Sequence, residues 1–172
     1  MDFIITPLGR EHERESFGCG ERSLDQYLHH FASQDIKRRL NRVFVTAPTK
    51  VPCLVAGFYS LSAGSLTATD LPDKLQRRLP RYPVPVVLLG RLAVAESHQS
   101  KGLGSILIAD ALQRIAQANQ VMAVYAVVVD ALHDRAAAFY RQFGFTPLPS
   151  QPLKLFLPMN SVINVARRQS RP

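Results

Sequence analysis

The sequence has few of the features that mark secreted, metal-binding or membrane proteins. Only two of its 172 residues are cysteines, Cys19 and Cys53, which is too few for a disulfide framework. No Cys/His spacing fits a zinc site, so we expect no metal. No apolar run approaches the roughly 20 residues of a membrane span, and no basic stretch followed by a long apolar region opens the chain, so we expect no signal peptide. These absences predict a cytoplasmic protein.

Acidic residues are also scarce relative to basic ones. The chain has 13 Asp and Glu against 21 Lys and Arg, which gives a net charge of +8 and a pI of about 10.0. Such an excess favours a polyanionic partner. A basic protein with no nucleic-acid role can have the same composition, so charge alone leaves both interpretations open.

The spacing of apolar residues predicts one domain, residues 1–172, of strands and helices. Strands are expected at 3–5, 43–47, 54–61, 86–94, 121–129 and 153–157, and helices at 24–31, 70–79, 102–118 and 133–142. Ser23 is the expected N-cap of the first helix, and the second and third strands are expected to form a hairpin. This order predicts an α/β (α+β) fold with a central mixed sheet flanked by helices. Residues 160–172 are expected to form a mobile basic tail.

A glycine-rich segment joins the strand at 86–94 to the helix at 102–118. Gly102 and Gly104 stand where a helix begins, and there the backbone N–H groups are unpaired and the helix dipole is positive. Glycine lets a phosphate approach the backbone closely, and Lys101 adds a positive charge, so the segment predicts a pyrophosphate site. The P-loop pattern is absent, and the dinucleotide pattern fails because Leu107 stands in place of its third glycine.

The pattern Gln99-x-x-Gly102-x-Gly104 resembles the acyl-CoA signature of the Gcn5-related N-acetyltransferases (GNAT), and residues 90–94 are similar to the strand that precedes it in that family. The resemblance implies the GNAT fold and acetyl-CoA as acetyl donor. For the loop alone, an ordinary strand–loop–helix connection is the alternative. The resemblance implies that acetyl-CoA contacts Leu92, Ala93, Val94, Gln99, Ser100, Lys101, Gly102, Leu103, Gly104, Ser105, Asp130, His133 and Phe139.

A second motif, Tyr140-x-x-x-Gly144-Phe145, resembles the end of a helix in the same family, where the tyrosine hydroxyl reaches the thioester sulfur. Acyl transfer expels a thiolate. A thiol of pKa about 8.5 leaves more easily when a phenol of pKa about 10 donates a proton to it. The resemblance therefore implies that Tyr140 is the general acid. For this tyrosine alone, a half-buried position in the core is the alternative.

The expected central strand carries Arg91 and no carboxylate, and this bears on the amine that is acetylated. A lysine amine of pKa about 10.4 must lose a proton before it attacks, whereas an α-amine of pKa about 7.7–8.0 is already partly neutral. Glu96 lies beyond the strand. The absence of an obvious base favours an α-amino acceptor, although a water relay could replace the base.

The N-terminal pattern Phe17-x-Cys19-Gly20-x-x-x-Leu24-Asp25-x-x-Leu28, with the motifs above, resembles the toxin branch of the superfamily over nearly the whole chain. Members of that branch belong to toxin–antitoxin pairs and acetylate the amino group of aminoacyl-tRNA, which blocks translation. The resemblance implies the same function here, an antitoxin of ribbon-helix-helix type, a homodimer, and contact with operator DNA only through the antitoxin complex. N-acetylation of a protein or small-molecule amine is the alternative. Cys19 is expected to be buried in a turn and not to act as a nucleophile.

Two basic clusters and one strand arginine then become candidate contacts for tRNA phosphates. For each cluster, a solvated surface is the alternative. The predicted tRNA-binding residues are Lys37, Arg38, Arg39, Arg42, Arg77, Arg78, Arg81 and Arg91.

Overall fold

The computed structural model describes residues 2–169, and its internal contacts divide the chain into two compact units. Unit 1 comprises Met1–Ser62 and Arg91–Ala111, and unit 2 comprises Ala63–Gly90 and Leu112–Pro172. Each unit is therefore built from two separate segments of the chain. The single domain expected for residues 1–172 stays a prediction.

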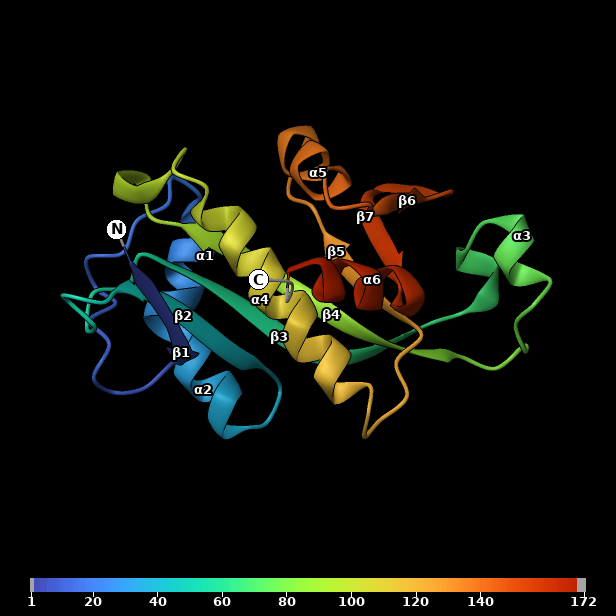
Figure 1. The fold of residues 1–172 in the computed structure, drawn as a ribbon, viewed down its shortest axis with the longest axis horizontal. Helices are drawn as coiled ribbons and strands as arrows, with labels where there is room; N and C mark the ends of the chain where they lie inside the picture. Colours follow the sequence, from blue (N-terminus) through green and yellow to red (C-terminus); the bar gives the residue numbers. More distant parts are fainter. Residues whose placement is uncertain (1, 170–172) are drawn as a thin grey trace. The chain divides into compact units, whose positions relative to one another are not determined.

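Seven strands form one mixed sheet in the order β1-β2-β3-β4-β5-β7-β6 (Figure 1). They are β1 (Phe3–Pro7), β2 (Arg42–Pro48), β3 (Gly57–Leu66), β4 (Val84–Val94), β5 (Ala126–Asp130), β6 (Thr146–Leu148) and β7 (Gln151–Pro158). β4 and β5 run parallel, whereas β2 is antiparallel to both β1 and β3, and β7 is antiparallel to both β5 and β6. The mixed sheet with its helices confirms the predicted fold class, and the β2–β3 pair confirms the predicted hairpin.

The helical elements are short except for α4. They are α1 (Arg22–Gln26), the π-helical turn η1 (Tyr27–Phe31), α2 (Ala32–Lys37), the 3₁₀ turn η2 (Ala68–Asp70), α3 (Asp73–Gln76), the 3₁₀ turn η3 (Glu96–His98), α4 (Leu103–Ala118), α5 (Asp134–Arg141) and α6 (Met159–Gln169). Between residues 2 and 169, no helix is both long enough and apolar enough to cross a membrane.

In unit 1, helical segments cover both faces of β2 and β3. Leu28 and Ala32, both fully buried, pack with Val45 and Phe58 in the core beneath η1 and α2. On the other face, the Tyr59 hydroxyl donates a hydrogen bond to the Asp110 carboxylate of α4. Apolar burial and this polar anchor together hold the first half of α4, and therefore the loop that precedes it, against the sheet.

In unit 2, β5 is the buried central strand. Its residue pairs with β4 run from Val86↔Ala126 to Leu89↔Val129, and it pairs with β7 on its other edge. α6 packs on β5 and β7, and α5 packs on β7. β5 is paired at both edges and covered by a helix, so its side chains are buried. This burial explains why its sequence is apolar at nearly every position.

Several predicted elements begin at other residues than expected; the strand expected at 54–61, for example, begins at Gly57. The first helix begins at Arg22 and not after Ser23, because the N–H groups of Leu24 and Asp25 both donate to the carbonyl of Glu21. The helix expected at 70–79 is divided between η2 and α3. Pro72 separates these two turns, because a proline forces the residue before it out of the helical region.

The strand expected at 121–129 begins only at Ala126. Val121 and Met122 are 88% and 68% exposed, and their N–H groups donate to the carbonyl of Ala118 in a turn that ends α4. The apolar side chains of Val121 and Met122 extend the apolar run of β5 in the sequence. Periodicity alone does not distinguish a buried apolar run from an exposed one, so the strand was predicted too long.

The predicted mobile tail is helical as far as Gln169. Met159, Val162 and Ala166 are buried at the spacing of one helix face, so α6 is held by apolar burial despite its two arginines. The last three residues of the chain lie outside the described part. The short strand β6 was not predicted, because three residues carry too little periodicity.

Candidate active site

The loop between β4 and α4 has an unusual backbone conformation. Ser100 has φ of 60° and Gly102 has φ of 80°, both in the left-handed region, and Lys101 between them does not. Alternation of this kind is typical of anion-binding nests, in which successive backbone N–H groups point toward one side. α4 begins at Leu103, so its unpaired N-terminal N–H groups follow directly. The loop can therefore bind a pyrophosphate with backbone donors alone.

The side chain of Gln99 anchors this loop from below. Its Nε2 donates to the carbonyl of Cys19 at 2.8 Å and to the carbonyl of Val94 at 2.9 Å. The Glu96 N–H donates to the carbonyl of Gly18 at 2.9 Å. The carbonyl groups of the N-terminal Phe-x-Cys-Gly turn thus hold the loop in place by hydrogen bonds. This explains why the two motifs occur together although about 80 residues separate them.

Replacing Gln99 should test this support. Gln99→Glu removes both hydrogen bonds and places a carboxylate against two carbonyl oxygens, so we expect it to lower the free energy of unfolding by about 2–3 kcal/mol. Gln99→Ala loses the same bonds without the repulsion and should cost about 1–2 kcal/mol. Urea unfolding of both variants measures the difference, and an equal loss in both would contradict the role of the two carbonyls.

Cys19 is buried in this turn, and Cys53 is exposed. Burial raises the pKa of the Cys19 thiol from 9.0 to about 12, because the thiolate would lose its hydration. A thiol that stays protonated is a poor nucleophile. The prediction that Cys19 is buried in a turn is confirmed, and its chemistry in this position is inert.

The two cysteines should therefore react with thiol reagents at very different rates. The raised pKa lowers the thiolate fraction of Cys19 at neutral pH about 1,000-fold, and burial blocks access as well. We expect native protein at neutral pH to take up one equivalent of a maleimide, and Cys53→Ser to take up none on the same timescale. After unfolding, both proteins should take up one further equivalent of maleimide, at Cys19. Rapid labelling of native Cys53→Ser would contradict the buried turn.

Arg91 of β4 stacks on a buried tyrosine in unit 1. Its guanidinium carbon lies 3.6 Å from the ring centroid of Tyr27, which is only 4% exposed. Burial raises the pKa of Tyr27 to about 12, and the positive charge of Arg91 opposes part of that rise. The cation–π contact fixes one face of the guanidinium and leaves its edge available for hydrogen bonds.

In unit 2, α5 carries the second motif. His133 is its N-cap, and the Nδ1 of this side chain accepts a hydrogen bond from the N–H of Ala136 at 3.2 Å. Tyr140 in the last turn is 6% exposed, and its ring contacts those of Phe139 and Phe145 edge-on. Burial raises the pKa of the Tyr140 phenol, so this group stays protonated at neutral pH and can serve as a proton donor.

The predicted tRNA-binding residues fall into three places. Lys37, Arg38, Arg39 and Arg42 are exposed around the C-terminus of α2 in unit 1, and Arg91 lies in the same unit on β4. Arg77, Arg78 and Arg81 are exposed beyond α3 in unit 2. The predicted acetyl-CoA contacts are divided in the same way, with residues 92–94 and 99–105 in unit 1 and Asp130, His133 and Phe139 in unit 2. The predicted catalytic residue Tyr140 also lies in unit 2.

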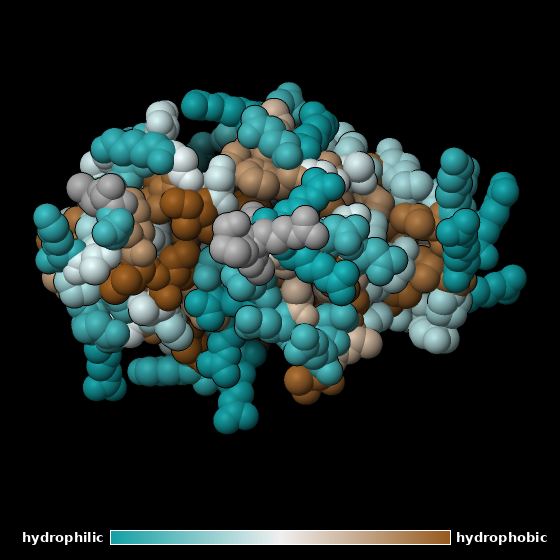
Figure 2. Space-filling model, in the orientation of Figure 1, coloured by the Kyte–Doolittle hydropathy of each residue, from teal (hydrophilic) through white to brown (hydrophobic). Residues whose placement is uncertain are grey.

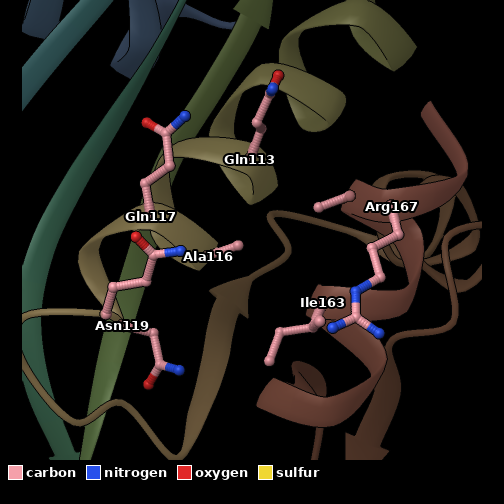
Figure 3. Close-up of a pocket in the computed structure, with 8 residues that line it drawn as sticks. Gln113, Ala116, Gln117, Asn119, Ile163 and Arg167 are labelled. Atoms are coloured by element: carbon pink, nitrogen blue, oxygen red, sulfur yellow. The ribbon is translucent and has the colours of Figure 1, made fainter. Parts of the chain in front are cut away.

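Unit 2 also has an open groove of about 420 Å³ between the second half of α4 and α6 (Figure 3). Ala116 and Ile163 give it an apolar floor, and amide side chains together with Arg167 form its rim. None of the predicted acetyl-CoA or tRNA contacts lines it. Among the described residues, no group of three or more His, Cys, Asp or Glu side chains is arranged to hold a metal ion.

Comparison with known proteins identifies the family. The family model "Acetyltransferase (GNAT) family" matches residues 63–145, which include the phosphate loop and the Tyr140 motif. A "tRNA-acetylating toxin" of Mycobacterium tuberculosis is 44% identical over 144 residues, which are 84% of this chain and 84% of that protein. The chain belongs to the GNAT acetyltransferase family. It is therefore an acetyl-CoA-dependent N-acetyltransferase, as the two motifs predicted.

Solved structures agree with this GNAT assignment. AtaT complexed with acetyl-methionyl-tRNAfMet has a TM-score of 0.87 and 28% identity, covering 95% of this chain and 99% of AtaT. A tyrosine-to-phenylalanine mutant of AtaT, bound to the C-terminus of the antitoxin AtaR and acetyl-CoA, has a TM-score of 0.82 and 25% identity, covering 96% and 98% of the two chains. The predicted GNAT fold and acetyl donor are confirmed.

The sequence of this GNAT protein did not reveal two of its structural supports. The carbonyls of Gly18 and Cys19 hold the phosphate loop, and Tyr27 holds Arg91. Neither contact has a sequence signature, because each joins segments that are distant in the chain. The roles of the predicted site residues in binding and catalysis stay predictions.

Proposed function

We propose that this protein is the toxin of a toxin–antitoxin pair that transfers the acetyl group of acetyl-CoA to the α-amino group of aminoacyl-tRNA in the cytoplasm. The observation that carries the proposal is the 44% identity, over 84% of both chains, with a tRNA-acetylating toxin. An acetylated α-amine is no longer a nucleophile and cannot form a peptide bond through that nitrogen. The consequence is a block of translation.

The donor would be held by the loop before α4. Backbone N–H groups around Ser100 and Gly102 face the pyrophosphate, and those at the start of α4 extend the site. Lys101 now donates to the carbonyl of Ser97 at 2.9 Å, so its ammonium is close to the loop and can pair with a phosphate oxygen. Leu92 and Val94 of β4 offer backbone groups to the acetyl and pantetheine portions.

The chemical step is a direct transfer without a covalent enzyme intermediate. The amine nitrogen attacks the thioester carbonyl carbon, the carbon–sulfur bond breaks, and the departing sulfur receives the proton of the Tyr140 phenol. The attacking nitrogen loses its proton to solvent, and the Tyr140 phenolate takes a proton back from solvent, which restores the phenol. Burial keeps Tyr140 protonated before the step. AtaT has been solved as a tyrosine-to-phenylalanine mutant bound to acetyl-CoA.

An α-amine suits a site without a dedicated base. β4 presents Arg91 toward Tyr27, and Glu96 lies in η3 beyond the strand. An esterified amino acid has lost its carboxylate charge, so its α-amine is more acidic than that of a free amino acid, and a good part of it is neutral at physiological pH. Arg91 and the basic clusters supply the charge that a tRNA phosphate backbone attracts.

The same family relationship suggests the partners. AtaT has been solved with the C-terminus of the antitoxin AtaR, and a cognate antitoxin of ribbon-helix-helix type is the partner we propose here. Homodimer formation and contact with operator DNA through the antitoxin complex belong to the same proposal. Light scattering of the purified toxin, alone and with the antitoxin, measures both assemblies.

Labelled acetyl-CoA and purified tRNA test the proposed reaction. We expect label to enter charged tRNA and not uncharged tRNA, because only the charged form carries an α-amine. Mild alkaline hydrolysis should then release an N-acetylated amino acid that mass spectrometry identifies. Transfer of label to protein lysines with none to charged tRNA would refute the tRNA substrate and favour the alternative of a protein amine.

A further inference from the structure

Residues 67–83, between β3 and β4 in unit 2, form an arm with two different faces. Leu71 is fully buried, and Leu75 and Leu79 pack against the same core cluster at intervals of four residues. At the base of the arm, the Asp70 carboxylate accepts hydrogen bonds from the N–H and hydroxyl of Thr67. The three leucines therefore pack the arm against its unit, and the capping box stabilises the turn at its base.

The outer face of the arm is strongly basic. Lys74, Arg77, Arg78 and Arg81 are all exposed there, and around α3 Figure 2 shows long hydrophilic side chains that project from the surface. Within residues 2–169, no carboxylate lies at salt-bridge distance from any of the three arginines. The arm carries two acids, Asp70 and Asp73, against four basic side chains, and Asp70 is engaged at the base. The guanidinium groups are thus available to an anion from outside.

An exposed aromatic side chain directly follows these basic residues in the chain. Tyr82 follows Arg81 directly and is 70% exposed, whereas the other four tyrosines of the chain are buried or half-buried. Arginines bind phosphates, and an exposed ring offers a stacking surface for a base. The arginines and the tyrosine follow or interleave with the three leucines that pack on the core of unit 2, so this stretch of chain is attached to the unit before any ligand binds.

We propose that the arm 67–83 is a binding element for single-stranded RNA, in which Tyr82 stacks on an unpaired base while Arg77, Arg78 and Arg81 hold the neighbouring phosphates. The inference rests on the proposed tRNA substrate and deepens it. An acidic polypeptide would satisfy the arginines equally well, but it has no flat base to match the tyrosine ring. RNA is therefore the ligand that uses both features of the surface.

Fluorescence anisotropy with a labelled short single-stranded RNA tests the arm without any acetylation. Tyr82→Ala should weaken binding about 5- to 100-fold, the usual effect of losing one stacked base, and Tyr82→Phe should stay within about twofold of wild type. A duplex RNA of the same length should lose less affinity in Tyr82→Ala, because its bases are already stacked. Met122→Ala, which also removes a large exposed apolar side chain, is the matched control and should bind as wild type.

Salt dependence tests the arginines separately. Replacing Arg77, Arg78 and Arg81 together with glutamine should make the slope of log affinity against log salt shallower by about two, from about 0.7 for each lost phosphate contact. Lys50→Gln, an exposed charge outside the arm, should leave the slope unchanged. Circular dichroism confirms that every variant is folded before it is measured.

Three outcomes would overturn the arm as an RNA element: unchanged affinity in folded Tyr82→Ala, an equal loss in Tyr82→Phe, or displacement of the RNA by polyglutamate as readily as by unlabelled RNA. If Tyr82→Ala binds RNA with unchanged affinity while the protein still acetylates charged tRNA, the arm is refuted and the proposed function is retained. Conversely, a loss of RNA binding in Tyr82→Ala, in a wild-type protein that acetylates no charged tRNA, would support the arm and remove the proposed substrate.

Discussion

Tyr140→Phe should lower kcat for acetyl transfer to charged tRNA by about 100- to 10,000-fold, the usual contribution of a positioned general acid. The variant keeps the ring that packs against Phe139 and Phe145, so the fold and the affinity for acetyl-CoA should be unchanged. Single-turnover kinetics with labelled acetyl-CoA measure the transfer, and calorimetry measures the binding. Expression in bacteria should lose its toxicity in parallel.

Tyr125→Phe is the matched control for this substitution. Tyr125 also lies in unit 2, and partial burial also raises its pKa, but it is not part of the helix motif. It should retain full activity. A Tyr140→Phe enzyme with wild-type kcat would remove the general-acid role and leave Tyr140 as a core residue.

The direction of the pKa shift gives the pH dependence. Burial raises the pKa of Tyr140 above the ordinary phenol value of about 10, so the proton-donating form is complete at neutral pH. Ionisation of this residue can therefore reduce kcat only above about pH 10. An activity loss with an apparent pKa near 7–8 would have to come from another group.

Gly102→Val should weaken acetyl-CoA binding by about 5- to 30-fold or more. With φ of 80°, Gly102 has a backbone conformation that costs an L-residue about 1–2 kcal/mol, and more for a β-branched one. A Cβ there would meet no atom within 4 Å, so the penalty comes from the backbone and not from a clash. The variant can escape this strain only by turning the loop, which removes N–H groups from the phosphate nest.

Ser100→Gly is the opposite test in the same loop. Ser100 already has φ of 60° and carries a strained backbone, so glycine should relieve that strain. We expect acetyl-CoA affinity within about twofold of wild type, since the φ values of the nest are kept. Calorimetric titration of both variants makes the comparison. Equal affinities in Gly102→Val and wild type would show that the loop geometry does not determine binding.

The sequence alone was sufficient for the features that arise within short stretches of chain. The apolar run of β4, the glycines before α4 and the Tyr-x-x-x-Gly-Phe helix end each depend on neighbouring residues, and their resemblance to family motifs implied the GNAT fold and the acetyl donor. Element boundaries were less accurate where burial decides them. Val121 and Met122 were predicted as strand residues and are solvent-exposed. The basic end of the chain forms α6, because Val162 and Ala166 are buried on one face of that helix.

Only the tertiary structure showed what supports the phosphate loop, the feature on which the sequence argument first depended. Gln99 holds it to the carbonyl of Cys19, some 80 residues earlier in the chain, and Arg91 rests on Tyr27. Such contacts join residues whose proximity is created by the packing of separate elements, and no local pattern encodes them. The same holds for Tyr82. The sequence marked the basic cluster beside it, but only the structure showed that three leucines pack on the core while the arginines and Tyr82 are exposed.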